Sequence, residues 1–241
     1  MQLSRREPEK TLPEEGYIGR VNHTMQTPGS ANIPQWGMVI DLRKCIGCQA
    51  CSVACAMENQ LPQNHFRTFV SIYEVEWNGQ PRRAVLPRTC NHCDNPPCVR
   101  NCPTQATYKD KTGIVLVNNT VCIGCGYCIQ TCPYDARYIN PDSHTTDKCT
   151  FCLHRLNAGL LPACVETCVG GARVFGDLTD PNSQVSQLLK ENAVRVMKPD
   201  LNTLPRVYYI AMDEYGKVGL DRSGSPKSEI SASAKGKVLN G

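Results

Sequence analysis

Sixteen cysteines fall into four groups of four, with none left over, and this pattern constrains the chain more than any other feature. The first and third groups share the spacing C-x2-C-x2-C-x3-C, the second has C-x2-C-x4-C-x3-C, and the fourth has C-x2-C-x11-C-x3-C. So dense a set of thiols must either form disulfides or bind metal. In chain order the groups are Cys45, Cys48, Cys51, Cys55; Cys90, Cys93, Cys98, Cys102; Cys122, Cys125, Cys128, Cys132; and Cys149, Cys152, Cys164, Cys168.

Disulfides and structural zinc both fit the spacing poorly. Three cysteines at two-residue gaps lie within seven residues, and bridges between such close neighbours are strained. No secretory signal is readable, so the sequence offers no support for an oxidising compartment. Structural zinc sites use two C-x2-C pairs separated by a longer loop. The fourth group alone could pass for such a site, but three cysteines at two-residue gaps followed by a fourth do not match it.

Iron–sulfur clusters fit the spacing well. The segment from Cys122 to Pro133 matches the bacterial two-cluster ferredoxin run C-x2-C-x2-C-x3-C-P, whose fourth cysteine ligates a different cluster from the first three. Because every cysteine belongs to a group of four, the sequence predicts four [4Fe–4S] clusters. Each oxidised cluster with its four thiolates carries a charge of about −2.

The rest of the composition agrees with metal as a structural element. Leu, Ile, Val and Phe total 51 of 241 residues, about 21%, which is a thin aliphatic core for this length. The net charge of +4 is too small and too evenly spread to indicate nucleic-acid binding. No window of 18 apolar residues predicts a membrane helix. Glu7 and Pro8 follow the Arg5-Arg6 pair where a twin-arginine signal needs apolar residues, so we expect no export signal.

The groups repeat in pairs. Residues 38–48, MVIDLRKCIGC, align with residues 115–125, VLVNNTVCIGC, at an offset of 77. Residues 96–102, PPCVRNC, align with residues 162–168, PACVETC, at an offset of 66. Each copy of the first pair reads as a short apolar strand followed by a ligand loop whose glycine permits close backbone approach. The repetition predicts two ferredoxin-like modules.

Simple elements are predicted between the groups. A hairpin joins residues 68–77 to residues 82–86 through the Asn78-Gly79 turn, and a second joins residues 106–108 to residues 114–117. A helix is predicted to begin with Asp180 as N-cap and Pro181 in its first position. Residues 206–210 read as a late strand. The predicted apolar face of the helix is Val185, Leu188 and Leu189.

Three phrases carry a family resemblance: MVIDLRKCIGCQACSVAC, TCNHCDNPPCVRNCPT and CTFCLHRLNAGLLPACVETC. They resemble the iron–sulfur (beta) subunits of the dimethyl sulfoxide reductase family of molybdopterin oxidoreductases, and most of all those of polysulfide, thiosulfate and tetrathionate reductases. The resemblance covers about residues 37–178. Nitrate reductase relatives carry tryptophan at the position of Cys125, giving a three-iron cluster, so the resemblance implies four-iron clusters throughout this chain. Formate dehydrogenase relatives carry a C-terminal membrane helix that this sequence lacks.

The resemblance also implies that ligands cross between groups. Groups one and four would build one module, and groups two and three a second module inserted within it. The implied ligand sets are Cys45, Cys48, Cys51 with Cys168; Cys149, Cys152, Cys164 with Cys55; Cys90, Cys93, Cys98 with Cys132; and Cys122, Cys125, Cys128 with Cys102.

The expected fold class is therefore α+β, with two ferredoxin-like modules related by internal repeat, short β-hairpins, few helices and extended terminal arms. The predicted organisation is an N-terminal arm of residues 1–36, a first module of residues 37–60 plus 141–180, a hairpin insert of residues 61–87, a second module of residues 88–140, and a C-terminal helix, strand and flexible tail over residues 181–241.

Several other residues near the cysteine groups can be interpreted in two ways. His92 either donates a hydrogen bond to a cluster sulfur or lies partly exposed on its loop. Four basic residues either balance cluster charge or form a solvated face: Lys44, Arg88, Lys148 and Arg155. Phe151 and Tyr127 are interpreted as shielding for the clusters. No catalytic set is readable in His65, Asp135 and Glu166.

The expected function is electron transfer without bond-making chemistry. The resemblance implies a relay between an integral membrane quinone-binding subunit and a molybdopterin-containing catalytic subunit. It implies an oxidised sulfur compound such as tetrathionate, polysulfide or thiosulfate as terminal acceptor, and leaves arsenate, selenate and dimethyl sulfoxide open because the catalytic subunit selects the substrate. The expected location is peripheral to the bacterial inner membrane, on the periplasmic face through co-export with a partner or on the cytoplasmic face. The alternatives are a free-standing polyferredoxin and a zinc-bound structural module.

Overall fold

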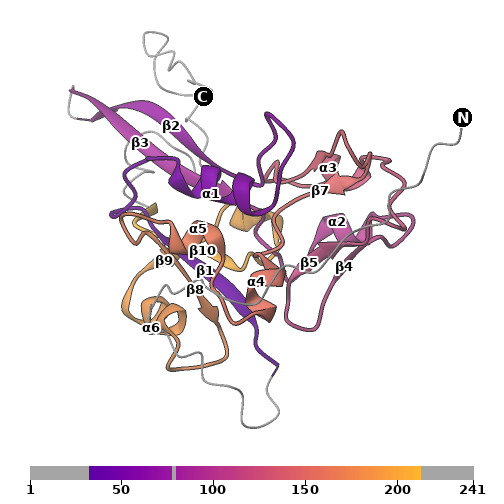
Figure 1. Ribbon diagram of the computed structural model, residues 1–241. Helices are drawn as coiled ribbons and strands as arrows, with labels where there is room; N and C mark the ends of the chain where they lie inside the picture. The colour runs from indigo at the N-terminus through magenta and orange to yellow at the C-terminus, as the bar shows by residue number, and fades with distance from the viewer. Residues whose placement is uncertain (1–32, 78–79, 213–241) are drawn as a thin grey trace, which may run out of the picture. The chain divides into compact units, whose positions relative to one another are not determined.

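The largest sheet has four strands in the order β8-β1-β10-β9 (Figure 1). The computed structural model describes residues 33–77 and 80–212. Strand β1 runs parallel to β10 and antiparallel to β8, and β10 runs antiparallel to β9. The strand bounds are β1 Trp36–Asp41, β8 Arg173–Asp177, β9 Val194–Arg195 and β10 Val207–Ile210.

Strand β1 forms because its apolar residues are consecutive and both faces of the sheet are covered. Met38, Val39 and Ile40 are each at most 1% exposed. Alternate residues point to opposite faces, so Met38 and Ile40 join the main core while Val39 joins a second, smaller core. A continuous apolar run is typical of a strand buried on both sides.

Helix α6, Gln184–Glu191, covers one face of this sheet and packs against β1 and β8 (Figure 1). Val185 is fully buried and packs with Leu188 and Leu189 in the smaller core, which confirms the predicted apolar face. The predicted start of the helix is wrong. Ser183 is the N-cap, and its hydroxyl accepts a hydrogen bond from the amide of Ser186, while Asp180 instead accepts one from the amide of Asn182.

Three antiparallel hairpins complete the strands. The predicted pairing of residues 68–77 with the following strand is confirmed as β2, Thr68–Trp77, with β3, Gln80–Thr89; its turn lies outside the described residues. The second predicted hairpin is confirmed as β4, Thr107–Lys109, with β5, Val115–Val117. A third, β6 with β7, was not predicted. Its strands are Tyr138–Ile139 and Thr146–Asp147.

Short helices begin at or next to the cysteines. Their bounds are α1 Ala50–Glu58, α2 Pro97–Arg100, α3 Tyr127–Gln130, α4 Leu153–Asn157 and α5 Ala163–Glu166, and one 3-10 turn spans Pro199–Leu201. Gly47 and Gly124 occupy equivalent loop positions and both have positive φ. At Gly124 a Cβ atom would come within 2.4 Å of the His144 carbonyl oxygen, so both the conformation and the space require glycine there.

The predicted terminal arms fall largely on residues 1–32 and 213–241, which lie outside the described residues. The boundaries of the two modules stay predictions, as does their origin by repetition. The mixture of small sheets and short helices agrees with the α+β class.

Candidate metal centre

Two of the implied cysteine sets each surround a cavity. One cavity is lined by Cys45, Cys48, Cys51 and Cys168, so group four closes a space opened by group one. Another is lined by Cys90, Cys93, Cys98 and Cys132, which joins group two to group three. In both cases the fourth thiol comes from a residue remote in the sequence.

A third set is brought together by α1, α4 and α5, of which α1 and α5 pack against each other. All four of its cysteines, Cys55, Cys149, Cys152 and Cys164, are buried. Burial raises the pKa of the Cys55 thiol well above its usual range, and the other three thiols raise it further. Four thiols that repel one another's ionised forms lie close in space.

The fourth set lies on two packed helices. Cys102 follows α2, whereas Cys128 lies in α3 behind the loop that carries Cys122 and Cys125, and α2 packs against α3. Cys128 is buried in a small core with Cys98 and Val115, whereas Cys125 is exposed. The structure brings these elements together, and the sharing of one cluster by the four cysteines stays a prediction.

The buried thiols fit a cluster-binding site chemically. Burial raises the pKa of Cys93 to about 12 and that of Cys164 to about 12, so neither thiol ionises at neutral pH unless a metal displaces its proton. Within residues 33–77 and 80–212, no three His, Cys, Asp or Glu side chains converge as ligands of a single ion. A cuboidal cluster does not need such convergence, because each of its four irons takes one thiolate.

Buried polar atoms without partners point to the same conclusion. His92 is fully buried, so the interpretation of a partly exposed loop histidine is wrong. Its Nδ1 accepts a hydrogen bond from the Val115 amide at 3.1 Å, which leaves the ring proton on Nε2. That Nε2 and both side-chain polar atoms of Asn91, which lines the cavity of Cys90, have no partner in the described structure. Burial lowers the pKa of His92, so the ring stays neutral.

Comparison with known proteins identifies the family. Two family models, both of the 4Fe-4S dicluster domain, match residues 82–178 and 44–106. A tetrathionate reductase subunit of Salmonella typhimurium is 55% identical over 184 residues, covering 75% of this chain and 74% of the relative. A polysulfide reductase chain of Wolinella succinogenes is 40% identical over 187 residues, covering 73% and 94%. The arsenate respiratory reductase iron–sulfur subunit of Shewanella sp. is 40% identical over 223 residues, covering 72% and 95%.

This chain therefore belongs to the 4Fe-4S iron–sulfur subunits of molybdopterin oxidoreductases. The resemblance stated from the sequence is confirmed, together with electron transport by iron–sulfur chemistry as its field of function. In the described part of this iron–sulfur subunit, no helix combines the length and the apolar character needed to cross a bilayer.

The basic residues near the cysteines differ in their surroundings. Lys148 of this iron–sulfur subunit is 1% exposed and donates hydrogen bonds from Nζ to the carbonyls of Val115 and Cys149, so it does not belong to a solvated face. Lys44 is exposed at the rim of the Cys45 cavity. Arg88 pairs with Asp135, and Arg155 pairs with Glu58 and Glu166.

The aromatic residues also divide. Phe151 is buried and stacks on His92 with 3.7 Å between ring centroids, which suits the shielding role. Tyr127 is 57% exposed and covers little. His65, which like Asp135 and Glu166 belongs to no readable catalytic set, contacts Tyr138 with its ring tilted by 39° to the tyrosine ring.

Three residues next to cysteine sulfurs escaped the sequence analysis. Arg137 donates from Nη2 to the Cys98 sulfur at 3.0 Å, Arg173 lies 4.0 Å from the Cys164 sulfur, and Asn59 lies 3.6 Å from the Cys55 sulfur. A signal for the two arginines was present in the sequence, since each stands five residues after the last cysteine of its group. Asn59 follows α1 directly and has no comparable signal.

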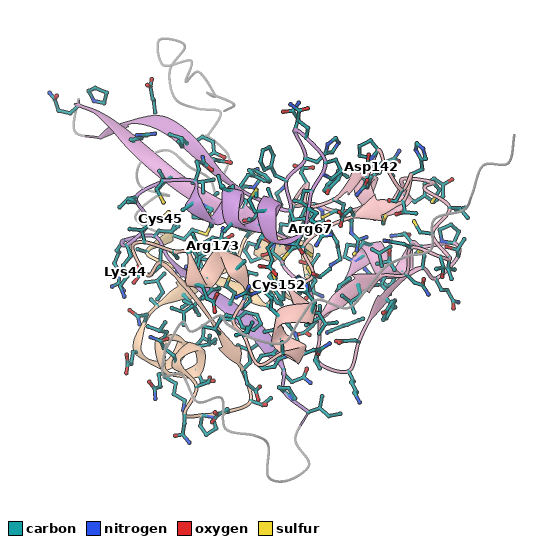
Figure 2. All side chains as sticks on the ribbon, viewed as in Figure 1. Lys44, Cys45, Arg67, Asp142, Cys152 and Arg173 are labelled. Atoms are coloured by element: carbon teal, nitrogen blue, oxygen red, sulfur yellow. The ribbon has the colours of Figure 1, made fainter. Side chains whose placement is uncertain are left out.

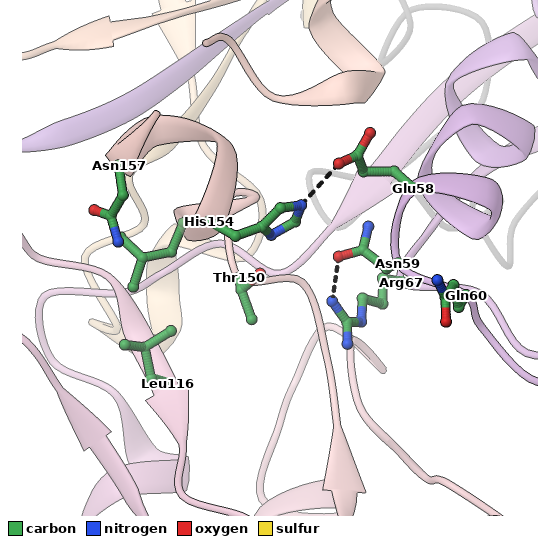
Figure 3. Close-up of a pocket in the computed structure, with 9 residues that line it drawn as sticks. Glu58, Asn59, Gln60, Arg67, Leu116, Thr150, His154 and Asn157 are labelled. Carbon is green, nitrogen blue, oxygen red and sulfur yellow. Dashed lines mark hydrogen bonds and ion pairs between the residues drawn. The ribbon is translucent and has the colours of Figure 1, made fainter. Parts of the chain in front are cut away.

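A surface cavity of about 580 Å³ lies beside the Cys55 set, between the ends of α1 and α4 (Figure 3). Glu58 accepts a hydrogen bond from His154 at 2.8 Å, and Asn59 accepts one from Arg67 at 2.7 Å. Glu58 is thus paired with His154, and the Arg67 guanidinium with the neutral amide of Asn59. Asn59, which lies beside the Cys55 sulfur, thus forms part of the wall of this cavity.

Proposed function

We propose that this protein relays electrons through four [4Fe–4S] clusters between a quinol-oxidising membrane subunit and a molybdopterin catalytic subunit. The observation that carries the proposal is the pair of cavities, each lined by three cysteines of one group and one cysteine of a distant group. When bound, each cluster accepts and releases a single electron. The protein binds the clusters, excludes water from them and sets their potentials.

The proposed ligand sets follow this crossed arrangement. Each set takes the first three cysteines of one group and the last cysteine of another. The sets are Cys45, Cys48, Cys51, Cys168; Cys55, Cys149, Cys152, Cys164; Cys90, Cys93, Cys98, Cys132; and Cys102, Cys122, Cys125, Cys128.

Exposure supports a relay with two accessible ends. Cys48 and Cys125 are exposed, and they belong to different sets. Each loop also exposes an isoleucine, Ile46 at 65% and Ile123 at 67%. The cysteines of the Cys55 set are all buried. Electrons enter and leave at the sets of Cys48 and Cys125, because only a site near the surface approaches a partner's redox group closely.

The proposed partners and acceptor come from the relatives. The names of two relatives specify tetrathionate and polysulfide reductases, and another specifies an arsenate respiratory reductase. We place this protein in the reduction of a sulfur compound, tetrathionate, polysulfide or thiosulfate, since the relative at 55% identity is a tetrathionate reductase subunit. It lies peripheral to the membrane, on the periplasmic face.

Metal analysis and co-purification test the proposal together. The full chain, purified without oxygen, is expected to contain roughly sixteen irons and an equal amount of sulfide, four of each for every cluster. Zinc in place of iron would overturn the electron-transfer function. A pterin-containing subunit and a quinone-binding membrane subunit are expected to co-purify. A monomeric iron-loaded protein without either partner would favour the free-standing polyferredoxin.

A further inference from the structure

Two buried arginines occupy corresponding positions in the two halves of the site, where the first half is formed by cysteine groups one and four and the second half by groups two and three. Arg137 stands five residues after Cys132, and Arg173 stands five residues after Cys168. Arg137 is 6% exposed and Arg173 is 3% exposed. Each guanidinium donates a hydrogen bond to a buried threonine hydroxyl, Arg137 to Thr107 at 3.3 Å and Arg173 to Thr68 at 2.9 Å.

Arg173 lies between two of the proposed cluster sites. It lines the cavity of Cys45 and Cys48, as Lys44 does (Figure 2). Its Nη1 also lies 4.0 Å from the sulfur of Cys164, which belongs to the neighbouring set. The thiolate charges that act on it come from both sets, Cys51 from one and Cys164 with Cys149 from the other.

Arg137 is placed in the same way in the other half. It lines the cavity of Cys90 and donates to the sulfur of Cys98 at 3.0 Å. Its threonine partner, Thr107, donates its backbone amide to the sulfur of Cys102, which belongs to the neighbouring set. Burial alone would lower the pKa of Arg137, but the thiolates of Cys98 and Cys90 from its own set, with a smaller effect from Cys128 of the neighbouring set, hold it above its usual value.

Neither guanidinium has a carboxylate partner within residues 33–77 and 80–212. Burying an unpaired cation is costly, and the cost is met only when an anion lies beside it. The remaining anions near each arginine are cysteine thiolates, and a bound cluster with its four thiolates carries about −2. The two arginines are therefore placed as counter-ions to clusters.

We propose that Arg137 and Arg173 each raise the reduction potentials of the two clusters that flank them, so that one arginine serves each pair. The inference rests on the proposed function. A fixed positive charge stabilises the reduced cluster, which carries one more negative charge, more than the oxidised one. A charge shared by two neighbouring sites raises both potentials together and so keeps the step between them small.

The test compares charge-removing and charge-keeping variants of the full chain, purified without oxygen and with its clusters. Arg137→Gln and Arg173→Gln remove the charge, Arg137→Lys and Arg173→Lys keep it, and the exposed Arg100→Gln is the matched control because Arg100 lies two residues from both Cys98 and Cys102. Redox titrations followed by electron paramagnetic resonance resolve the potentials, and iron is counted in every sample.

Each glutamine variant is expected to lower two of the four potentials, a different pair for each arginine. The expected size is a tenfold or greater loss in the equilibrium constant for reduction, about 59 mV for a one-electron couple. The lysine variants retain most of the wild-type potential, and Arg100→Gln changes none.

Unchanged potentials, or an equal shift of all four in each variant, would overturn the inference. If a glutamine variant loses its iron, the lysine variant at the same position decides: retained iron and potentials support the charge, and the same loss refutes it. A wild-type chain with far fewer irons than roughly sixteen overturns the proposed function instead.

Discussion

The two halves hold their proposed cluster sites on scaffolds of different size. The sites of groups one and four adjoin a four-stranded sheet and the nine-residue helix α1. The sites of groups two and three are held by the four-residue helices α2 and α3 and by two-stranded hairpins. Two of the three buried residues in the small core of that second half, Cys98 and Cys128, are themselves proposed ligands. The second half therefore depends more on metal for its structure.

A segment from the C-terminal part of the chain compensates for this weakness. The amides of Asp94 and Asn95 donate to the carbonyls of Leu204 and Thr203, and the amide of Arg206 donates to the carbonyl of Asn91. Because β10 follows at once, these bonds tie the second half to the main sheet.

Removal of iron by a chelator under oxidation is expected to unfold the second half before the first. Amides of β4 and β5 will exchange hydrogen at near-unfolded rates, while those of β1 and β8 keep partial protection, since only the latter lie in a sheet with its own apolar core. Hydrogen exchange followed by mass spectrometry measures this. Equal protection in both halves would contradict the comparison.

Removal of one cysteine is expected to cost more at a buried site than at an exposed one. Cys164→Ser places a hydroxyl in a fully buried site and will lose a whole cluster, whereas Cys125→Ser at the exposed site will lose a single iron and leave a three-iron cluster. Iron content and paramagnetic resonance distinguish the two results. A three-iron cluster in both variants would show that burial does not decide the outcome.

His92→Phe is expected to destabilise the holoprotein by about 1–3 kcal/mol, because the buried amide of Val115 loses its acceptor while an aromatic ring remains to stack on Phe151. For a protein of this size each kcal/mol lowers the thermal midpoint by about 2–4 °C. His65→Phe is the control, since His65 is less buried and also contacts an aromatic ring. Similar midpoints in the two variants would refute the role of Nδ1.

Asp94→Asn removes the ion pair between Asp94 of the second half and Arg206, which directly precedes β10. Burial alone would raise the pKa of Asp94, but hydrogen bonds from Lys109 and Arg206 outweigh it and hold the pKa below its usual value of 3.8. The carboxylate therefore stabilises the fold at every pH above about that value and loses its effect only as the pH falls through the lowered pKa. The side chain is 42% exposed, so the expected loss is below about 1 kcal/mol.

The measurement is the thermal midpoint of wild type and Asp94→Asn at pH 7 and pH 5. The difference between them should be the same at both values, because Asp94 is ionised at each. A difference that shrinks at pH 5 would mean that the pKa of the Asp94 carboxyl is raised above its usual value instead of lowered.

The elements that could be predicted from the sequence are those whose formation depends on neighbouring residues. The strand at Met38 and the pairing of β2 with β3 follow from apolar runs and alternation within a few positions. The predicted start of α6 is wrong because Asp and Ser both favour the N-cap position, so Asp180 and Ser183 were equally good candidates. The choice depends on the tertiary contact in which the hydroxyl of Ser183 donates to the carbonyl of Asp177.

Long-range features had no comparable signal. The pairing of β1 with β10 joins residues separated by almost the whole described chain, and nothing in either strand indicates its partner. Arg137 and Arg173 do share a position five residues after the last cysteine of a group, but their burial was missed because charged residues are almost always exposed unless paired. Here the proposed partner of each arginine is a cluster, which the sequence does not contain. Only the geometry around each guanidinium therefore indicates it.

The position of β10 has a consequence for the order of synthesis. It lies between β1 and β9 in the main sheet, yet its residues follow every one of the sixteen cysteines. A ribosome releases these residues only after all the ligands have emerged, so the sheet stays open along one edge of β1 until then. The sheet that adjoins the sites of groups one and four is therefore completed only after every proposed ligand has been synthesised.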